Sequence, residues 1–515
     1  MQTSGSLFSN QEQEHVDIDG LQLLIAREQE KNKFLNDENR WLREQLAELK
    51  RNRFGKKSER WESEEQLVLN EAEVESRKPG PGEEEEPDIE VKGHTKKRGH
   101  RKPLPESLAR EIVKIELPLA EQVAEDGTQL KVIGWEISEK LKYEPSKMSV
   151  VQYHRAKYGA DFGDYEKTAP PVPSIIPKGL STPELLAAIV VSKYTDGLPL
   201  YRMEDIFKRQ GIDLPRQTMA RWVVAVAQAC QPVWNVLSDR LLNAFYVACD
   251  ETRVQVLKEN GRPAEAQSWM WVRSTPFGRS KIVLFDYNTS RSGDTAKTLL
   301  AEFEGYLQCD GLNSYDALEG ERVVRVGCNM HARRRFEQAV VTGAKEGKSL
   351  GEVGLEFYSQ IYDLETEIKE KTPEERYQIR LERALPVFEE MKAWVAKTKG
   401  KVPEKSKIGK AFSYFESEYE YLTGYLKDGR LEPDNGFTER AIRKFAIGRN
   451  NWMFSDTEDG ANASALLYSL VVTAKTNGVN PYKALVKMFR ELPTVSTIEE
   501  YERLAELILS PENTA

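Results

Sequence analysis

Three acidic residues occupy positions at which carboxylates can act together. Asp250 and Asp310 each end a short apolar run, and Glu439 lies one turn into a helix that opens after a Pro-Asp-Asn-Gly turn. Carboxylates that gather in a partly apolar site repel one another, and divalent cations relieve this repulsion. Hard oxygen ligands suit Mg²⁺ or Mn²⁺, and two such ions can activate an attacking oxygen and stabilise the leaving oxygen at phosphorus. The three acids therefore predict two-metal-ion phosphodiester chemistry on nucleic acid.

Each of these acids also has a purely structural interpretation. An Asp at the end of a strand often forms a turn, and Glu439 can pair with Arg443 one turn further along its helix. Other acids compete for the same roles, although Asp434 is better placed to cap the helix that carries Glu439. Whether the acids are catalytic or structural depends on whether the fold brings these distant segments of the chain together. The competing acids are Glu251, Asp316, Glu432 and Asp434.

The segment that contains Asp250 and Asp310 changes between strand and helix periods in a specific order. Three β runs precede a helix, a fourth strand, a short connection, a fifth strand and a second helix. This order is typical of a ribonuclease H-like fold, in which the first and fourth strands are neighbours and a closing helix carries a further acid. The strands are expected at residues 245–257, 268–273, 281–285, 306–309 and 323–327, and the helices at 294–303 and 331–341.

The 515 residues exceed what a single hydrophobic core can hold, so several domains are expected. The patterns predict a multidomain α+β / α/β protein with a ribonuclease H-like catalytic core, a helical insertion, an N-terminal coiled coil and a small β-rich module, which the runs at 110–117 and 148–153 indicate. The expected order is a disordered N-terminus (1–15), a coiled-coil zipper (16–60), an acidic then basic linker (61–102), the β-rich module (103–168), a Pro-rich linker (169–180), a helical, helix-turn-helix-like region (181–243), the first part of the core (244–347), the helical insertion (348–430), the closing catalytic helix (431–460) and a C-terminal helical region (461–515).

A heptad repeat of apolar residues begins near residue 21. Leucines at positions 21, 35, 42 and 49 share one seam position, and Asn32 and Asn39 fall on the other. Buried Asn side chains cost stability but favour a two-stranded, in-register coiled coil, because each amide needs a partner. We therefore expect a homodimer or a higher oligomer. The alternative is a single amphipathic helix docked on the body of the protein.

The net charge of −9 is a poor guide to the partners of this chain. Residues 62–90 hold twelve acids against two bases, so the remainder carries a net charge of about +1. Basic clusters at 96–98 and 333–335 are therefore free to meet phosphate. The four cysteines are widely spaced, which argues against disulfides, and no apolar run is long enough for a membrane helix. Because no secretory signal is recognisable either, we expect a cytoplasmic, nucleoid-associated protein without a membrane partner.

Three helical periods occur between residues 182 and 229, and a Gly-Ile-Asp-Leu turn precedes the last of them, at 215–229. This spacing suits a helix-turn-helix, whose second helix enters the major groove of DNA. Arg216, Gln217 and Arg221 would then lie on the first turns of the recognition helix, where side chains reach bases or phosphates. The alternative is a helical subdomain that only packs against the body.

Four further residues are candidates for contact with DNA near the acids. His331 can lie near the metal site and touch the scissile phosphate, or it can be a satisfied core histidine. Arg440, Arg449 and Trp452 follow Glu439 and can clamp phosphate or stack on a splayed base. Ion pairs along the helix and a Trp in the core are the structural alternatives for these three residues.

Longer blocks of sequence surround these residues. They are Phe54-Gly-Lys-Lys-Ser-Glu, Ser192-Lys-Tyr through Leu198-Pro-Leu-Tyr-Arg, Asp250-Glu-Thr, Cys309-Asp-Gly, Cys328-Asn-Met-His-Ala-Arg-Arg-Arg-Phe, Asp434-Asn through Glu439-Arg-Ala, Gly448-Arg-Asn-Asn-Trp, Leu467-Tyr-Ser-Leu and Thr473-Ala-Lys-Thr-Asn-Gly. In these blocks, which cover nearly the whole chain, the sequence resembles the insertion-sequence-66 family of bacterial DDE transposases. The resemblance implies that Asp250, Asp310 and Glu439 form the DDE triad, that the substrate is DNA at the ends of a mobile element, and that small accessory proteins are partners.

One departure from the family concerns zinc. Family members usually carry a small zinc-binding module with a Cys-x-Cys-Gly-Gly element and a later Cys-x-x-Cys pair. The matching stretches here read Ala124-Glu-Asp-Gly and Tyr158-Gly-Ala-Asp-Phe, without a cysteine. Zinc needs about four soft or imidazole ligands, which His154 alone cannot supply. We therefore predict that residues 103–168 form a degenerate module that folds without zinc.

The sequence thus predicts a DNA transposase that hydrolyses phosphodiester bonds at the ends of an insertion sequence and transfers the 3′ hydroxyl to target DNA. The expected cofactor is a pair of Mg²⁺ or Mn²⁺ ions. Two other classes remain open. One is a ribonuclease H-like nuclease without strand transfer, and the other is a catalytically silent DNA-binding scaffold.

Overall fold

The chain forms two compact units, residues 66–170 and the remainder. A computed structural model describes residues 27, 148–159, 166–177, 179–320, 322–341 and 348–514. The predicted disordered N-terminus, coiled coil and linker, which together span residues 1–102, lie outside the described residues except for the helical Arg27. The predicted strand at 110–117 lies outside them as well.

A small hairpin is the regular structure described in the unit 66–170. Its strands β1 (Lys157–Gly159) and β2 (Glu166–Thr168) pair in antiparallel orientation. The predicted strand at 148–153 is wrong, because these residues form no strand and Val150 is 88% exposed. Apolar alternation makes a strand only when a partner strand and a second layer cover it, and the described residues supply neither here.

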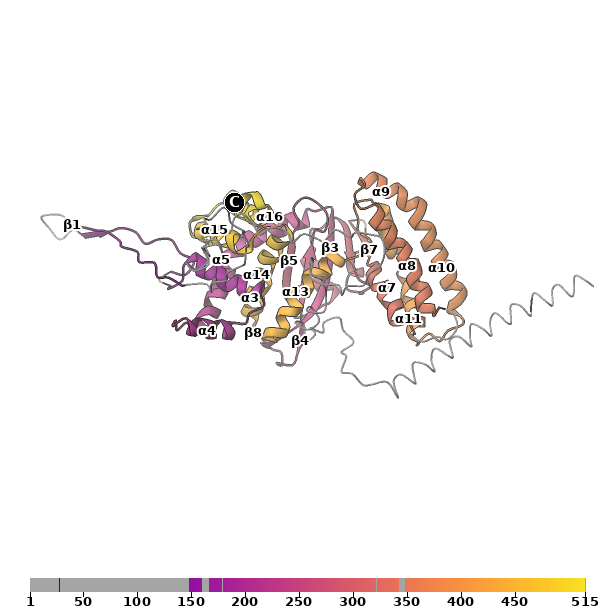
Figure 1. Cartoon of the computed structure of the whole chain (residues 1–515), viewed down its shortest axis with the longest axis horizontal. Coiled ribbons are helices and arrows are strands. Elements are labelled where there is room, and N and C mark those ends of the chain that lie inside the picture. The colour runs from indigo at the N-terminus through magenta and orange to yellow at the C-terminus, as the bar shows by residue number, and fades with distance from the viewer. Residues whose placement is uncertain are drawn as a thin grey trace, which may run out of the picture. The chain divides into compact units, whose positions relative to one another are not determined.

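The larger unit is built around a mixed sheet with the strand order β5-β4-β3-β6-β7 (Figure 1). β3 pairs antiparallel with β4 and β4 with β5, whereas β6 runs parallel to β3 and β7 parallel to β6. The predicted mixture of sheet and helices and the pairing of the first with the fourth strand are therefore confirmed. The strands are β3 (Tyr246–Lys258), β4 (Gln267–Ser274), β5 (Val283–Asn288), β6 (Gly305–Cys309) and β7 (Val323–Gly327).

The central strands are apolar because both faces of the sheet are covered. Residues 246–249 of β3 and 307–309 of β6 are buried without interruption. Parallel strands covered on both faces typically consist of continuous apolar runs. At its far end β3 also pairs in parallel with β8 (Ser455–Thr457), which the sequence did not predict. The three residues Ser-Asp-Thr are too short and too polar to show a strand period.

Helix α14 (Glu458–Thr476) covers β5 and is fastened to it by hydroxyl groups. The Phe285 N–H donates to Ser469 Oγ at 2.8 Å, and the Val283 N–H donates to Thr473 Oγ1 at 3.0 Å. β5 is an edge strand, and its outer N–H groups would otherwise be open to pairing with another chain. The helix therefore closes this edge of the sheet.

Helix α5 continues to Leu242, beyond the predicted end at residue 229. Pro232 lies inside the helix and removes one backbone hydrogen bond. The helix continues because Val233 and Leu237 after it are fully buried in the core. The helices of this unit outside the charged segment 348–430 are α3 (Pro183–Tyr194), α4 (Leu200–Arg209), α5 (Arg216–Leu242), α6 (Gly293–Leu299), α7 (Asn329–Gln338), α13 (Gly436–Trp452), α14, α15 (Pro481–Glu491) and α16 (Ile498–Leu509).

The charged segment after α7 forms a helical layer with its own hydrophobic core (Figure 1). Its first helix starts with a capping box between Ser349 and Glu352. Arg380 is fully buried in this layer and donates to Glu365 at 2.6 and 2.8 Å. The elements are α8 (Leu350–Glu367), α9 (Pro373–Ile379), a π-helical turn (Arg380–Ala384), α10 (Leu385–Lys399), α11 (Lys407–Ser417) and α12 (Tyr419–Leu422).

Replacing Arg380 by Leu should destabilise this helical layer strongly. The substitution leaves the Glu365 carboxylate, which is 8% exposed, without its main partner. Removing one member of a buried pair costs roughly 3 to 5 kcal/mol. Chemical denaturation followed by tryptophan fluorescence measures this loss. Arg383→Leu is the matched control, since the Arg383–Glu367 pair is about half exposed and its removal should be silent. Equal losses in the two variants would contradict the prediction.

The four cysteines and the lengths of the described helices can be compared with what the sequence predicts. Cys230, Cys249, Cys309 and Cys328 are buried free thiols, as their wide spacing predicts. Within the described residues, none of the helices combines the length and the apolar character that crossing a bilayer requires.

Candidate active site

The register of two parallel strands brings Asp250 and Asp310 side by side. β3 and β6 pair through Ala248 and Gln308, and each acid stands two residues beyond its member of that pair. Residues at equal distances from a paired position on neighbouring parallel strands share a face and lie about 4.8 Å apart across the strands. The acids that end two distant apolar runs are therefore neighbours.

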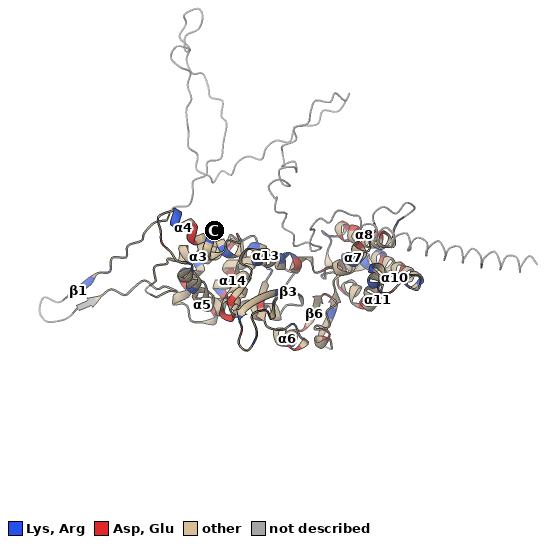
Figure 2. Ribbon diagram, turned by 90° about the horizontal axis from the view of Figure 1, so that it is seen from below, with Lys and Arg blue, Asp and Glu red and all other residues tan. Residues whose placement is uncertain are grey.

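The start of α13 is attached to the end of β3 at which Asp250 lies, and the helix runs beside this strand (Figure 2). Asn435 is buried, and its side-chain amide donates to the Cys249 carbonyl at 2.8 Å. Because Cys249 precedes Asp250, this bond ties the beginning of the helix to the first acid. Glu439 follows one helical turn later and therefore stays close to this end of β3.

The acids share one electrostatic environment. Burial raises the pKa of Asp250 well above its usual range, and the charges of Glu251, Asp310 and Glu439 raise it further. Burial and then the charge of Asp310 raise the pKa of Glu251 to about 7, against the opposing effect of a hydrogen bond from Tyr315. Carboxyl groups influence one another in this way only at short range. The three predicted acids and Glu251 therefore form one cluster.

Helix α7 supplies the side chains that contact Glu439. Arg334 donates to Glu439 Oε2 at 3.1 Å, and His331 Nδ1 lies 3.5 Å from Glu439 Oε1. Both Glu439 Oε1 and His331 Nδ1 are buried and lack a hydrogen-bond partner among the described residues. His331, expected near the acids, thus touches one of them. The contacts of Glu439 with α7 go beyond the simpler expectation of a pair within its own helix.

The carboxylates of Asp250 and Asp310 meet backbone N–H groups. Asp250 accepts from the Glu251 N–H at 2.8 Å, and Asp310 accepts from the Leu312 N–H at 3.1 Å. Neither has an ion pair with Lys or Arg in the part of the chain that the structure describes. Partly buried carboxylates that repel one another and have no cationic partner fit a hard divalent cation. Glu439 Oε1 is also without a hydrogen-bond partner among the described residues, and it lies beside His331.

A softer set of donor atoms adjoins the acids. Ligand atoms of Cys328, His331 and Glu439 lie within 4.8 Å of one another. Burial raises the pKa of the Cys328 thiol, which therefore stays protonated, and the thiol accepts a hydrogen bond from the Asn435 N–H at 3.3 Å. A protonated thiol is a poor metal ligand. The carboxylates thus remain the better donors for a divalent cation.

Glu251 is more deeply involved in the cluster than the sequence suggested. The sequence marks it only as a competitor of Asp250, whereas in the structure its side chain is 4% exposed. The Tyr315 hydroxyl donates to it at 3.0 Å, and Arg291 lies 3.6 Å away. The available signal was its place directly after Asp250. Tyr315 and Arg291 gave no signal, because each comes from a connection between elements.

Arg325 in β7 positions the second acid. It donates to the Asp310 carbonyl at 3.2 Å and to Glu418 at 2.8 Å, and it contacts Asp316. Asp316, a competitor of Asp310 at the sequence level, is therefore engaged by Arg325. An arginine within the apolar run Val-Val-Arg-Val-Gly is itself a signal of a buried partner, since arginine is rarely buried unpaired.

The residues predicted to contact DNA from the helical region lie on the first turns of α5. Arg216, Gln217 and Arg221 are all exposed. The turn before them includes Gly211, whose φ of +79° suits glycine. α4 and α5 pack against each other across this turn. The three side chains are accessible to a nucleic acid, and their role in recognition stays a prediction.

The candidates on α13 have different surroundings. Arg440 is exposed, whereas Arg449 donates to Thr252 Oγ1 of β3 at 3.3 Å. The Trp452 ring packs edge-on against Phe445, with 5.6 Å between the ring centroids. Arg449 and Trp452 therefore help to hold α13 on the sheet and core. A contact of these residues with DNA stays a prediction.

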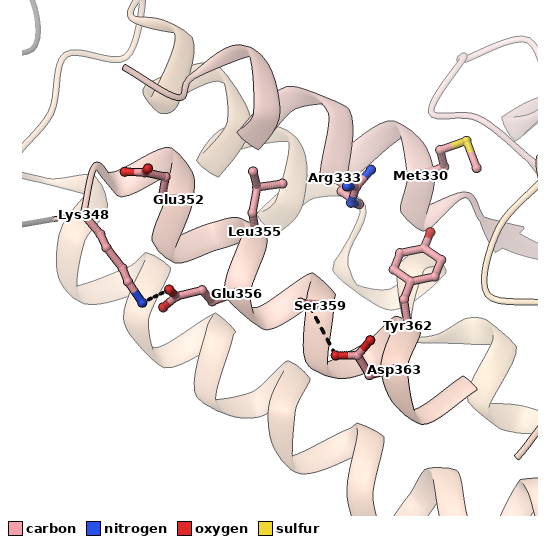
Figure 3. A pocket seen from close by; sticks show the side chains of 9 residues that line it. All are labelled: Met330, Arg333, Lys348, Glu352, Leu355, Glu356, Ser359, Tyr362 and Asp363. Atoms are coloured by element: carbon pink, nitrogen blue, oxygen red, sulfur yellow. Dashed lines mark hydrogen bonds and ion pairs between the residues drawn. The ribbon is translucent and has the colours of Figure 1, made fainter. Parts of the chain in front are cut away.

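A groove of about 620 Å³ is lined by side chains of α7 and α8, which pack against each other. Figure 3 shows Lys348 paired with Glu356, and Ser359 with Asp363, on one wall of the groove. Three carboxylates and two basic side chains line it. This balance does not favour an anionic ligand, so the groove is a poor candidate for binding nucleic acid.

Comparisons with known proteins agree with these observations. The sequence model described as Transposase IS66 family matches residues 178–463, and the one described as Transposase C of IS166 homeodomain matches 41–113. Two Sinorhizobium fredii proteins, named uncharacterized protein y4qI and uncharacterized protein y4jD, are each 31% identical to this chain. The first alignment covers 80% of this chain and 79% of the relative, and the second covers 78% and 80%. A third, uncharacterized protein y4hP, is 27% identical over 80% of this chain and 78% of its own. The chain therefore belongs to the insertion-sequence-66 family of transposases.

Proposed function

We propose that the chain cuts DNA at the ends of its mobile element and joins the freed 3′ hydroxyl to target DNA, with Asp250, Asp310 and Glu439 as the catalytic acids. The observation that carries this proposal is that Asp310 and Glu439 both act electrostatically on the buried Asp250. Two of the three acids follow equivalent register positions on neighbouring parallel strands, and the third is on a helix tied to the residue before Asp250. Such a cluster suits reactions at phosphorus better than proton transfer by one acid.

The acids would hold two divalent cations, Mg²⁺ or Mn²⁺. Bound cations supply activation of the attacking oxygen and stabilisation of the leaving oxygen in an in-line displacement. Arg334 holds Oε2 of the Glu439 carboxylate from α7, while Oε1 has no hydrogen-bond partner among the described residues. His331 offers a ring nitrogen beside the same carboxylate, where it can donate a hydrogen bond to a phosphate oxygen.

The same proposal extends to the fold and to the remaining segments of the chain. We assign the sheet and the helices around it to a ribonuclease H-like core, with the predicted boundaries 244–347 and 431–460 on either side of the insertion. The exposed residues at the start of α5 would contact DNA outside the catalytic centre. The coiled coil at 16–60 would pair two copies, because two element ends must be brought together. Small accessory transposition proteins would act as partners, and residues 103–168 would form a module that folds without zinc.

Strand transfer is tested with the purified full-length chain, Mg²⁺, a duplex taken from the inverted repeats that flank the coding region, and a supercoiled plasmid. The expected products are end fragments joined to the plasmid, and they should disappear when EDTA removes the metal. Cleavage without joining would show a nuclease instead. Absence of both, with DNA binding retained, would show a DNA-binding scaffold and overturn the proposal.

A further inference from the structure

A second, smaller cavity lies where the C-terminal half of α13 meets the end of α3 and the helix α14. Figure 2 shows α3 and α14 near α13. α3 is in contact with both helices, and Tyr468 of α14 packs against Phe445 of α13. The cavity has a volume of about 150 Å³, and Ile447 at its rim is 41% exposed, so it opens to solvent. Sites for small organic ligands begin at roughly 300 Å³. The cavity therefore suits an occupant of only a few atoms.

Positive charge gathers around this cavity. Lys444 and Lys475 line it, and the pKa of Lys444 is lowered by burial and by the charge of Lys475. The ammonium group of Lys193 lies 5.5 Å from the Trp452 ring, and burial lowers its pKa to about 8. None of the three ammonium groups forms an ion pair or hydrogen bond within the described residues. Asp196 is the carboxylate that lines the cavity, so the net charge there is positive.

Buried donor groups without acceptors also face this region. The hydroxyl protons of Thr195 and Tyr468 are buried and have no acceptor among the described residues. Thr195 and Tyr468 line the cavity. The Trp452 indole N–H can only donate, so its closeness to the Tyr468 hydroxyl leaves the proton of that hydroxyl still without an acceptor. Buried polar groups normally find a partner, and an acceptor-only ligand would satisfy these donors.

Glycine at position 448 allows the Tyr468 hydroxyl to approach the backbone of α13. A Cβ atom there would overlap with the hydroxyl oxygen of Tyr468 and lie 3.3 Å from the indole nitrogen of Trp452. Gly448 has no positive φ that would require glycine for the backbone alone. The absence of a side chain at Gly448 is therefore explained by the close approach of the Tyr468 hydroxyl and the Trp452 indole.

We propose that this cavity binds one phosphate group of the DNA backbone. Ammonium groups together with hydroxyl and N–H donors form the usual surroundings of a protein-bound phosphate. The proposal rests on the proposed function, which makes DNA the substrate. Gly448 follows Glu439 by nine residues, about 13 Å along the helix axis. A phosphate held here would fix the DNA strand at a set distance from the reacting phosphate and would carry no sequence information.

The salt dependence of DNA binding tests this assignment. Full-length wild type and the double variant Lys444→Gln/Lys475→Gln are titrated with fluorescent end duplex in EDTA, between about 50 and 200 mM salt. Loss of one phosphate contact should reduce the slope of log K against log salt by about 0.9, equally on end DNA and on an unrelated duplex. The charge-matched control Lys397→Gln/Lys410→Gln, with exposed lysines on α10 and α11, should keep the wild-type slope.

A second variant tests whether DNA binding depends on the donors of the cavity and not only on the positive charge of the surface. Thr195→Val removes one donor at almost constant volume and charge, so affinity should fall several-fold while the slope stays unchanged. Thermal unfolding checks that the variants remain folded. An unchanged slope in the lysine double variant would overturn the proposal. So would stabilisation of the wild type by inorganic phosphate together with an unchanged DNA slope, because the cavity would then be a site for small anions.

The same experiments separate this proposal from the proposed function. Binding is measured in EDTA and needs no catalysis, whereas cutting and joining need Mg²⁺. If the lysine double variant shows the reduced salt slope but the wild type never cuts DNA, the phosphate site is supported and the transposition chemistry is contradicted. If the wild type cuts and joins DNA but the double variant keeps the wild-type slope, the transposition chemistry is supported and the phosphate site is contradicted. A chain that binds no DNA overturns both.

Discussion

Replacing Asp250 or Asp310 by Asn should lower the rate of DNA end cleavage by about 10³-fold or more, the effect expected when a group that stabilises the transition state is lost. The amide keeps the size of the carboxylate but removes its charge, so the cluster holds a divalent cation weakly. Glu439→Gln should act in the same way. The three acids act as one unit, and the double variant Asp250→Asn/Asp310→Asn should therefore be no less active than either single variant.

Glu432→Gln is the control for this series. Glu432 is close to Glu439 in sequence, but its side chain is 42% exposed and lies 3.6 Å from Arg376 of the helical insertion. Its cleavage rate should stay within a few-fold of wild type. Single-turnover cleavage of a labelled end duplex at saturating Mg²⁺ measures all the variants. Near-normal cleavage by Asp250→Asn or Asp310→Asn would remove these acids from the mechanism.

Asp250→Asn should also stabilise the metal-free protein at neutral pH. Folding raises the pKa of Asp250 above its ordinary value of 3.8, so the unfolded chain gives up this proton more easily than the folded chain. The destabilisation is therefore absent below about pH 3.8 and grows as the pH rises toward the raised pKa. At pH 7 in EDTA the variant should gain about 1 to 2 kcal/mol in free energy of unfolding, the usual gain from relieving one strained position.

Added Mg²⁺ should reverse this order of stability. A cation that binds only the folded cluster stabilises the wild type by mass action, and the variant should gain much less. Thermal unfolding in EDTA and in increasing Mg²⁺ measures both effects. Asp213→Asn, at an exposed acid in the turn before α5, should change neither the stability in EDTA nor the stabilisation by Mg²⁺. A wild type that is the more stable protein in EDTA would contradict the idea that the acids repel one another.

The strand pattern around the acids was predictable because the central strands are buried on both faces. Continuous apolar runs mark such strands, and Asp250 and Asp310 stand out as the first charged residues after two of them. β8, by contrast, is a strand only because β3 lies beside it. The extension of α5 through Pro232 likewise depends on tertiary burial, which outweighs a local helix-breaking signal.

The contacts around the acids were less accessible to sequence reasoning than the acids themselves. Arg334, which holds Glu439, is one of three consecutive arginines, and no local pattern says which of them turns toward the site. Tyr315 reaches Glu251 from a connection without a regular period. Residue type and strand position select candidate acids, whereas their partners are chosen by how the segments pack.

One buried side chain contacts both the helical insertion and the turn that precedes α13. The Asn329 amide donates to the Leu422 carbonyl at the end of α12 and to the Pro433 carbonyl before α13, both at 2.9 Å. The helical insertion and the turn before Glu439 therefore share one buried amide as a common anchor. A displacement of α12 would be passed through Asn329 to this turn, and so to the position of the third acid.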